Sequence, residues 1–527
     1  MRHKRFTGET KATNLKQQTA ELSPVGRKTY GQILKSSALI GGSSVLNIGF
    51  SIVRTKAMAL MLGPAGVGLL GLYWSIMDVV RAIGGMGINT SGVRQIAEAV
   101  GSGDTQRIAR TVTTLRRVAL VLGGLGALLL VIFCKPVSRL SFGDERHAGL
   151  VALLAVAVFF ADVSAGQMAV VQGMRRVRDL ATLSVLGAFY GTLFSILIVY
   201  FFGEPGLVPS LVCVTAMGIL TSWWYSRKIK VERVVMNFRD ISREASALLK
   251  LGFIFMLTTL MSMAVAYLIR IIVLRKIGVA EAGYYQAAWA LGGMYVGFIL
   301  QAMGTDFYPR LTAVANNNPE CNRLVNEQAE VGMLMAGPGV LGTLTFAPLV
   351  IQLFYSAEFG SAVEILRWIC LGMMLRVASW PMGFILGAKG AGQTIFWSEV
   401  AASASQIGLA WVCVLHFGLK GTGIAFFAAY VFYSCVIYAI VRSVSGFRWS
   451  AANKQLSLVY ASLISAVFVG WYFLPRTLVV VGGLVVTLLA GIHSLKKLCA
   501  MVPLARFPQP AQRLLILLRL APSHMNG

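Results

Sequence analysis

Charged residues are scarce in this chain of 527 residues. They make up 13% of it, whereas 56% of the residues are hydrophobic. Soluble domains typically contain about 25% charged and about 45–50% apolar residues. Apolar runs of about 20 residues, long enough to cross the ~30 Å hydrocarbon core of a bilayer, recur between residues 36 and 495. This composition excludes an ordinary soluble domain and predicts an all-α polytopic membrane protein.

Acidic residues are scarcer than basic ones: 21 Asp and Glu stand against 47 Lys and Arg, which gives a formal net charge of +26. Such an excess also occurs in nucleic-acid-binding proteins, but here the bases follow the predicted topology. Of the 47, 34 lie on the side that we assign to the cytoplasm and seven on the outer side, as the positive-inside rule requires. We therefore expect no nucleic-acid partner, and we expect both termini in the cytoplasm.

Histidine and cysteine are too few and too scattered to indicate chemistry. The five His form no cluster, and the seven Cys show neither metal-ligand spacing nor a disulfide framework. We expect five Cys in or beside spans, and Cys321 and Cys499 in cytoplasmic loops. The P-loop pattern G-x-x-x-x-G-K-[ST] is absent, and no outer loop carries paired carboxylates. We expect no metal, no cofactor and no enzymatic activity, which leaves secondary transport.

The apolar runs predict about fourteen transmembrane helices. Residues 1–35 are polar and contain no signal-peptide pattern, so the first span, from Ser36, is expected to be an uncleaved anchor. The expected spans are 36–62, 66–92, 113–134, 148–171, 180–202, 206–226, 249–274, 283–304, 330–354, 363–386, 397–417, 421–441, 455–474 and 478–495. The resulting division is an N-terminal tail (1–35), an N-lobe (36–226), a cytoplasmic linker helix (227–248), a C-lobe (249–441), two further spans (455–495) and a C-terminal tail (496–527).

An internal repeat supports two lobes of six spans each. The stretch LGPAGVGLLGLYWS at 62–75 aligns without gaps with IGVAEAGYYQAAWA at 277–290. The identical pairs are Gly63/Gly278, Ala65/Ala280, Gly68/Gly283 and Trp74/Trp289. The match falls between the first two spans of each lobe, as a duplication would place it, and parallel repeats of this kind occur in transporters. We therefore expect a pseudo-twofold arrangement around a central cavity.

Charged residues inside the predicted spans are the candidate functional residues. The stretch YWSIMDVVRAIGGMG at 73–87 places Asp78 three residues before Arg81, so the two can pair on one helix face. A charge at the bilayer centre costs about 2.5–3.5 kcal/mol on insertion scales. One interpretation is a structural ion pair. The other is a cationic cavity that binds an anion, since bases outnumber acids inside the spans: Arg54, Lys56, Arg81, Arg270 and Arg376 against Asp78 and Asp162.

Three further charged residues, Glu364, Arg367 and Glu399, fall near the ends of spans. Long charged side chains at such positions extend their polar groups to the interface, so we assign them no function. Glycine is frequent, with 55 residues and clusters such as GGMG at 84–87. Small residues let transmembrane helices approach closely.

Three stretches carry a resemblance to a known family. They are LGPAGVGLLGLYWSIMDVVRAIGGMGINTSGVRQIAEA at 62–99, VVQGMRRVRDLA at 170–181 and AEFGSAVEILRWICLGMMLRVASWPMGFILGAKG at 357–390. With their spacing relative to the spans, the chain resembles the bacterial O-antigen and enterobacterial-common-antigen flippases of the multidrug/oligosaccharidyl-lipid/polysaccharide exporter superfamily. The resemblance covers residues ~30 to 445.

The resemblance implies a multi-pass protein of the bacterial inner membrane that moves an undecaprenyl-diphosphate-linked oligosaccharide between leaflets by alternating access. Arg54, Arg81, Arg270 and Arg376 would then bind the diphosphate or acidic sugars in a central cationic cavity. Asp78 would hold Arg81 or exchange a proton, and Asp162 would support or couple ions. The expected partners are this substrate, membrane lipid, and a polysaccharide polymerase with a chain-length regulator; the protein is expected to be a monomer.

Three other classes remain open from the sequence. A drug or cation exporter of the same superfamily predicts more deep acids than bases. A membrane glycosyltransferase, polymerase or ligase acting on lipid-linked sugars would need a large outer loop with catalytic side chains, whereas the longest outer loop here has about fourteen residues. A scaffold for an envelope-polysaccharide complex would keep the fold without transport.

Overall fold

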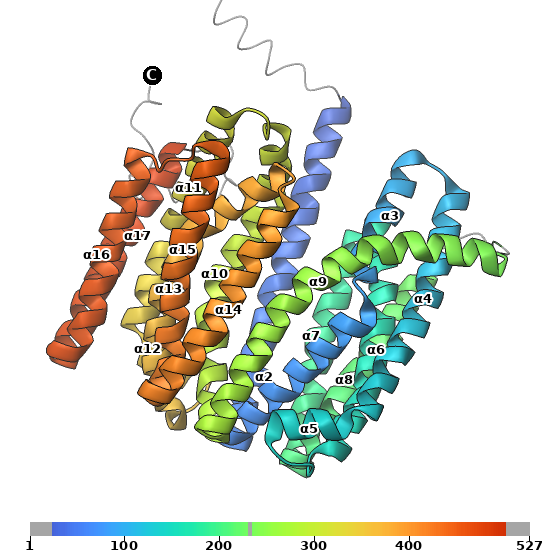
Figure 1. Ribbon diagram of the computed structural model, residues 1–527, viewed down its shortest axis with the longest axis horizontal. Helices are drawn as coiled ribbons and strands as arrows, with labels where there is room; N and C mark the ends of the chain where they lie inside the picture. Colours follow the sequence, from blue (N-terminus) through green and yellow to red (C-terminus); the bar gives the residue numbers. More distant parts are fainter. Residues whose placement is uncertain (1–23, 230–233, 235, 502–527) are drawn as a thin grey trace, which may run out of the picture.

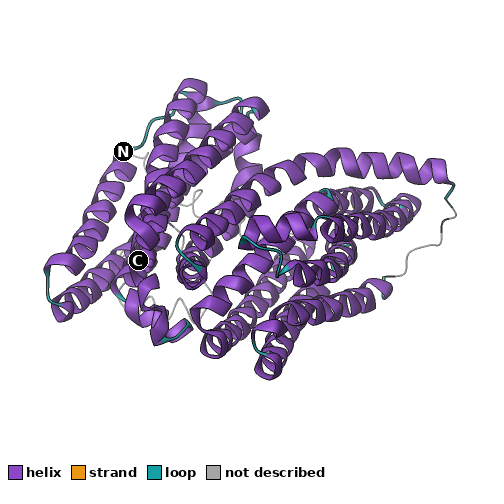
Figure 2. Ribbon diagram, turned by 60° about the horizontal axis from the view of Figure 1, so that its bottom comes forward, coloured by secondary structure: helices purple, strands orange, loops and turns teal. Residues whose placement is uncertain are grey.

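The structure is a computed structural model that describes residues 24–229, 234 and 236–501. In this part of the chain all regular elements are helices, and most connections between them are short (Figure 2). Residues 1–23 and 502–527, which belong to the expected tails, and residues 230–233 and 235 of the expected linker lie outside the described residues.

Helices α2 to α8 form the N-lobe, which lies on the right in Figure 1. Helix α2 lines the side that faces the C-lobe, while α4, α6, α7 and α8 pack together. The bounds are α2 Pro24–Gly85, α3 Ile88–Ser102, α4 Thr105–Ile132, α5 Cys134–Phe142, α6 Ala148–Gly173, α7 Val177–Phe202 and α8 Leu207–Arg227, with the short 3₁₀ helix η1 at Glu204–Gly206.

Helices α10 to α15 form the C-lobe, and α16 and α17 pack on its outer side against α11 (Figure 1). The bounds are α9 Phe238–Lys276, α10 Val279–Ala313, α11 Asn318–Thr345, α12 Ala347–Phe354, α13 Ala362–Ala388, α14 Gly392–Phe417, α15 Gly421–Ser445, α16 Ala451–Phe473 and α17 Arg476–Met501, with η2 at Ala357–Ser361 and η3 at Gly418–Lys420.

Helix α9 crosses from one lobe to the other (Figure 1). It contacts α3 and α4 of the N-lobe and α10 and α14 of the C-lobe. We expected a separate linker helix at 227–248 before a span at 249–274. The structure instead makes residues 238–276 one continuous helix; no proline separates its charged start from the apolar run that follows.

Within the described residues, nine helical segments are long and apolar enough to cross a membrane, or ten if the bent pair α11 and α12 counts as one. The bend between these two helices is 82°. Some of these segments join two of the expected spans: Gly392–Ser445 contains both 397–417 and 421–441. The protein is a multi-pass membrane protein, and the count of about fourteen spans stays a prediction.

The internal repeat marks the contact between the lobes. Gly63 and Gly278, which are equivalent in the repeat, both have positive φ (61° and 148°) and both break a helix. Five residues further on, a Cβ at Gly68 would lie 2.4 Å from the carbonyl oxygen of Val279, and a Cβ at Gly283 would lie 1.8 Å from that of Pro64.

These two close contacts between α2 and α10 are reciprocal, because Pro64 and Val279 are equivalent residues of the repeat. Only glycine allows the two backbones to approach this closely at each position. A pseudo-twofold relation between the lobes predicts such a reciprocal contact, and it is the clearest structural trace of the duplication.

The same end of the molecule carries polar contacts between α5 and α9. The Arg275 guanidinium donates from Nη2 to the carbonyl oxygen of Arg139 at 2.5 Å, and the hydroxyls of Ser141 and Tyr267 are 2.5 Å apart. Together with the glycine contact they hold the lobes against each other at this end, which the predicted topology assigns to the outer side of the membrane.

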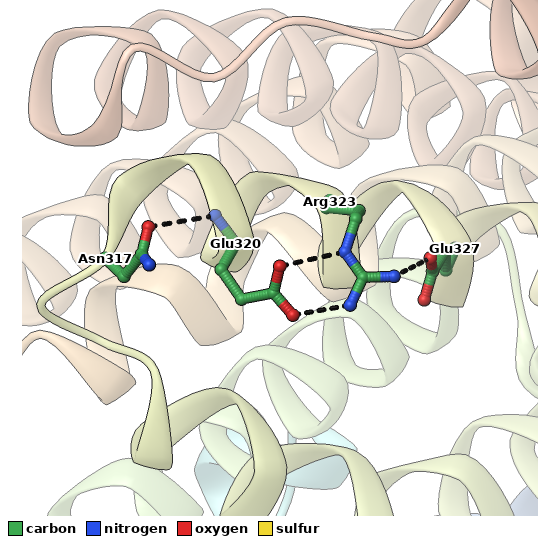
Figure 3. Close-up of polar contacts among 4 residues, drawn as sticks. All are labelled: Asn317, Glu320, Arg323 and Glu327. Atoms are coloured by element: carbon green, nitrogen blue, oxygen red, sulfur yellow. Dashed lines mark hydrogen bonds and ion pairs between the residues drawn. The ribbon is translucent and has the colours of Figure 1, made fainter.

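The opposite end carries exposed charge clusters. At the start of α11, Asn317 caps the helix by accepting from the backbone N–H of Glu320 at 3.3 Å (Figure 3). Arg323 donates to both carboxylate oxygens of Glu320, from Nε at 2.9 Å, and also pairs with Glu327 (Figure 3). Cys321 and Cys499, expected in loops at this end, are buried inside α11 and α17.

Candidate functional site

A pocket of about 230 Å³ lies in the N-lobe against α9 and is lined by Asp78, Arg81 and Asp162. Helix α2 supplies Asp78 and Arg81, and α6 supplies Asp162. The turn from α2 into α3 and the middle of α4 complete its walls, and α9 closes it with Met256, Thr259 and Met263. Three of the six residues expected from the sequence are therefore brought together.

The ion pair in this pocket differs from the one that we expected. Arg81 Nε lies 3.1 Å from Asp162 Oδ1, with the two side chains 30% and 8% exposed. We expected Asp78 to hold Arg81 or to exchange a proton; the direct partner of Arg81 is instead Asp162, which α6 brings from across the lobe. Among the described residues Asp78 makes no ion pair; it lies within electrostatic range of both Arg81 and Arg270.

Glycines bring α2, α4 and α6 close around this ion pair. A Cβ at Gly84 would lie 2.9 Å from the Cα of Gly126, and a Cβ at Gly123 would lie 3.3 Å from the Cβ of Asp162. The GGMG stretch thus has a packing role, since its first glycine lets α2 reach α4. The buried Oδ2 of Asp162 has no hydrogen-bond partner, so half of the carboxylate is unsatisfied.

A larger cavity, of about 510 Å³, lies in the C-lobe on the other face of α9. Helix α9 lines it with Ser262, Val265, Ala266 and Ile269, at i, i+3, i+4 and i+7, while the residues facing the N-lobe pocket lie on a different face of the same helix. Its other walls are Tyr285, Trp289, Tyr308, Arg376, Ser379, Trp380, Gly383, Phe384, Gly387, Glu399, Ala402, Ser403, Gln406, Ala429, Tyr430 and Tyr433.

Two charged residues line the C-lobe cavity. The Arg376 guanidinium lies 6.0 Å from the centre of the Tyr430 ring, within the range of a cation–π contact. Glu399 is exposed to the cavity, although we expected it to extend toward the membrane interface. The sequence holds a signal for its role: Glu399, Ser403 and Gln406 recur at i, i+4 and i+7 on one face of a helix.

Arg270 lines neither pocket but lies near one lining residue of each. Its Nε donates to Oε1 of Gln286 at 2.8 Å, and it is within electrostatic range of Asp78 and of Tyr285. Asp78 lines the N-lobe pocket, and Tyr285 lines the C-lobe cavity. Arg270 therefore places positive charge between the lobes, where α2, α9 and α10 meet.

The expected grouping of four arginines around one cavity is not what the described residues form. Arg81 and Arg376 line different pockets, and Arg54 lines neither: its Nη1 points at α7, 3.0 Å from where a Cβ on Gly191 would lie. Lys56 is likewise engaged elsewhere, donating to the carbonyl oxygen of Gln352 at 2.6 Å. Neighbouring residues on one helix point in different directions, so a common span does not imply a common cavity.

The charge balance of the two pockets also differs from the expectation that bases exceed acids. Asp78, Asp162 and Glu399 line them, against Arg81 and Arg376. With Arg270 included, acids and bases are equal in number.

The two remaining span-end residues lie outside both pockets. Arg367 is 9% exposed, and its guanidinium lies 3.9 Å from the Trp471 ring centre. Glu364 accepts from the Tyr472 hydroxyl at 3.2 Å.

Comparison with known proteins gives a family and a fold. The family described as "Polysaccharide biosynthesis protein" matches residues 57–364, which is more than half of the chain. The proteins named lipid III flippase from Escherichia coli (strain K12) and Shigella flexneri are each 24% identical over 428 residues, covering 78% of this chain and 99% of theirs.

Solved transporters share the fold. An inward-facing multidrug resistance MATE family transporter of the MOP superfamily superposes with a TM-score of 0.65 at 17% identity, over 78% of this chain and 96% of its own. The lipid II flippase MurJ in an inward closed conformation gives a TM-score of 0.64 at 14% identity, over 88% and 98%. These structures show the fold, and because the family model covers more than half of the sequence, the chain belongs to the polysaccharide biosynthesis protein family.

Proposed function

We propose that this protein is a flippase that moves an undecaprenyl-diphosphate-linked oligosaccharide from the cytoplasmic to the periplasmic leaflet of the bacterial inner membrane. Both termini lie in the cytoplasm, and the two lobes, divided at the residues predicted from the sequence, alternate in opening to each side. The relatives named lipid III flippase support the substrate class. The final polymer is an O-antigen or a related surface polysaccharide.

The observation that carries this proposal is the guanidinium of Arg81 in a pocket between helices beside α9, with Arg270 within electrostatic range of Asp78 in the same pocket. A guanidinium is always charged and matches two phosphate oxygens at once. The diphosphate of the substrate binds there, and Arg270 neutralises its second phosphate. The N-lobe pocket is small, as a site for the charged group alone requires.

Asp162 couples substrate binding to proton binding in the transport cycle. A diphosphate that binds Arg81 displaces Asp162, whose other oxygen already lacks a partner. A buried carboxylate without a counter-ion is unfavourable and is relieved by taking up a proton. Substrate binding and proton binding are therefore coupled, and release of the substrate on the outer side lets Asp162 return to Arg81. Asp78 supports Arg81 and Arg270 electrostatically.

The test is complementation of a strain that lacks its own flippase, with wild type, Arg81→Ala and Arg94→Ala. Arg94 is exposed and paired with Glu98 outside the pocket, so it serves as the matched control. We expect wild type and Arg94→Ala to restore surface polymer. With Arg81→Ala, the lipid-linked oligosaccharide should accumulate in the cytoplasmic leaflet even when transport is normalised to the amount of protein in the membrane.

Full rescue by Arg81→Ala would remove Arg81 from the mechanism. Failure of the correctly inserted wild type to move any lipid-linked oligosaccharide of its own host would refute the flippase assignment.

The protein works as a monomer in contact with membrane lipid, beside a polysaccharide polymerase and a chain-length regulator. Its product, a lipid-linked unit on the periplasmic side, is what a polymerase consumes. Native mass spectrometry of the purified chain checks the monomer. Cross-linking in the host membrane, followed by identification of the attached proteins, checks the two partners.

A second candidate is an ion-coupled exporter of cationic compounds. The observation that favours it is the acid content of the pockets, with Asp78, Asp162 and Glu399 lining them. This function predicts that expression of the protein raises resistance to cationic drugs and that Glu399→Gln abolishes the resistance. A flippase leaves resistance unchanged in both cases.

A further inference from the structure

The C-lobe cavity has the chemistry of a carbohydrate site rather than of a diphosphate site. Its volume of about 510 Å³ lies within the ~300–1,000 Å³ typical of small-molecule pockets, whereas the 230 Å³ of the N-lobe pocket lies below that range. The oligosaccharide of the proposed substrate is bulkier than its diphosphate. It needs the larger space, and the larger space is in the C-lobe.

Aromatic rings dominate the walls of this cavity. Trp380 packs edge-on against Phe384, with ring centres 4.5 Å apart, and Tyr430 lies near Tyr433, with centres 6.2 Å apart. Trp380 is only partly buried, so ring surface faces the cavity. The faces of pyranose rings carry C–H groups that stack on aromatic rings, and indole and phenol groups add a polar edge for hydrogen bonds.

Polar groups of α14 also line the cavity. Glu399, Ser403 and Gln406 share one helix face that points into the cavity. Carboxylate and amide oxygens accept hydrogen bonds from sugar hydroxyls, and the amide NH₂ and the serine hydroxyl also donate. Glu399 makes no ion pair among the described residues, so its carboxylate is available. A few placed polar groups among aromatic walls are what orient a ligand in such a pocket.

We propose that the C-lobe cavity binds the sugar unit of the substrate while the N-lobe pocket binds its diphosphate, with Trp380 as a stacking surface and Glu399 and Gln406 as hydrogen-bonding groups. This inference rests on the proposed flippase function. The two subsites lie on different faces of α9, and Arg270 is within electrostatic range of Asp78 in one and of Tyr285 in the other. A substrate bound in both spans the lobe interface and follows any movement of one lobe against the other.

The test compares two probes on the purified full chain in lipid nanodiscs. One probe is the lipid-linked oligosaccharide that accumulates in the host after deletion of this gene. The other is undecaprenyl diphosphate without sugar. We expect the wild type to bind the sugar-bearing probe at least about tenfold more tightly. Trp380→Leu and Glu399→Gln should each reduce that preference several-fold without changing the affinity for the sugarless probe.

Two control variants separate the subsites. Trp397→Leu changes a tryptophan of α14 that is 66% exposed and does not line the cavity, and it should keep the preference. Arg81→Ala should weaken both probes by the same factor. Glu399→Gln is nearly isosteric and exposed, so it tests the subsite even if Trp380→Leu fails to fold.

Each remaining outcome overturns the inference in a distinct way. Equal affinity of the wild type for both probes removes the sugar subsite and leaves the flippase. Equal loss for both probes in the C-lobe variants assigns the cavity to the diphosphate or the lipid. Binding of neither probe refutes the flippase function itself.

Discussion

The N-lobe pocket and the C-lobe cavity share α9 as a wall but are built in opposite ways. In the N-lobe, glycines such as Gly84 and Gly126 let three helices close around a buried ion pair. In the C-lobe, large aromatic side chains line a wider cavity with an exposed carboxylate at Glu399. The N-lobe pocket is therefore small and contains an ion pair, whereas the C-lobe cavity is larger and has aromatic walls.

The comparison also separates what the duplication kept from what it changed. Gly68 and Gly283 keep the same role in both lobes, at the contact between them. Asp78 and Arg81, by contrast, correspond to Gly293 and Val296 in the second repeat. The two lobes share residues at the contact between them but differ in the residues that line their pockets. The N-lobe has an acid and a base where the C-lobe has Gly293 and Val296.

The largest effect is expected where the lobes are alike. Gly283→Ala places a Cβ against the backbone oxygen of Pro64, which cannot rotate away. Overpacking typically costs about 1–3 kcal/mol and occasionally more. We expect Gly283→Ala to lose stability at or above the upper end of that range, and less of the protein to reach the membrane. Gly297→Ala, on the same helix with nothing within 4 Å, is the control. Thermal unfolding in detergent measures both, and equal melting temperatures would disprove the tight contact.

The next effect breaks the ion pair of the N-lobe. Asp162→Ala leaves the Arg81 guanidinium without its partner, and removing one member of a buried pair typically costs about 3–5 kcal/mol. We expect the lower end of that range, because the Arg81 side chain is 30% exposed. The double variant Asp162→Ala with Arg81→Ala should recover most of the stability and none of the transport. Recovery of transport would make the pair purely structural.

A smaller effect is expected for the acid of the C-lobe. Glu399→Gln changes an exposed side chain that has no ion pair among the described residues, and substitutions of this kind usually stay within about 0.5 kcal/mol. Its melting temperature should match the wild type, in contrast to Asp162→Ala. A large loss of stability in Glu399→Gln would show that the Glu399 carboxylate makes stabilising contacts. The two pockets would then not differ in this respect.

The smallest effect belongs to the exposed cluster at the start of α11. The Arg323 side chain, by hydrogen bonding and charge, lowers the pKa of Glu320. A lowered pKa stabilises the fold above the ordinary pKa of the carboxyl group, and this stabilisation is lost as the pH falls through the lowered value. Because the pair is exposed and screened, the free energy of unfolding of Arg323→Ala should lie close to that of wild type at pH 7 and equal it in acid. Thermal unfolding in detergent at the two pH values measures this difference. A difference that grows in acid would contradict this.

The sequence by itself determined the kind of protein and the equivalent positions of the internal repeat. The runs of apolar residues specify membrane helices, because a bilayer leaves the backbone no other partner. The repeat places Gly63 and Gly68 at positions equivalent to Gly278 and Gly283. Glycine is needed at Gly68 and Gly283 because the backbones of α2 and α10 approach closely there. Asp78, Arg81 and Asp162 could be selected because charge inside a span is rare and is kept for a reason.

Only the tertiary structure decided which of these residues meet. The partner of Arg81 is Asp162, 81 residues away, rather than Asp78 on the same helix. Arg54 and Arg376 lie apart from that pair, and Glu399, which the sequence placed at a span end, faces the larger cavity. Helical spacing fixes the face that a side chain occupies, but the direction of each face depends on how α2, α6, α9 and α14 pack, and that packing is set by contacts distant in sequence.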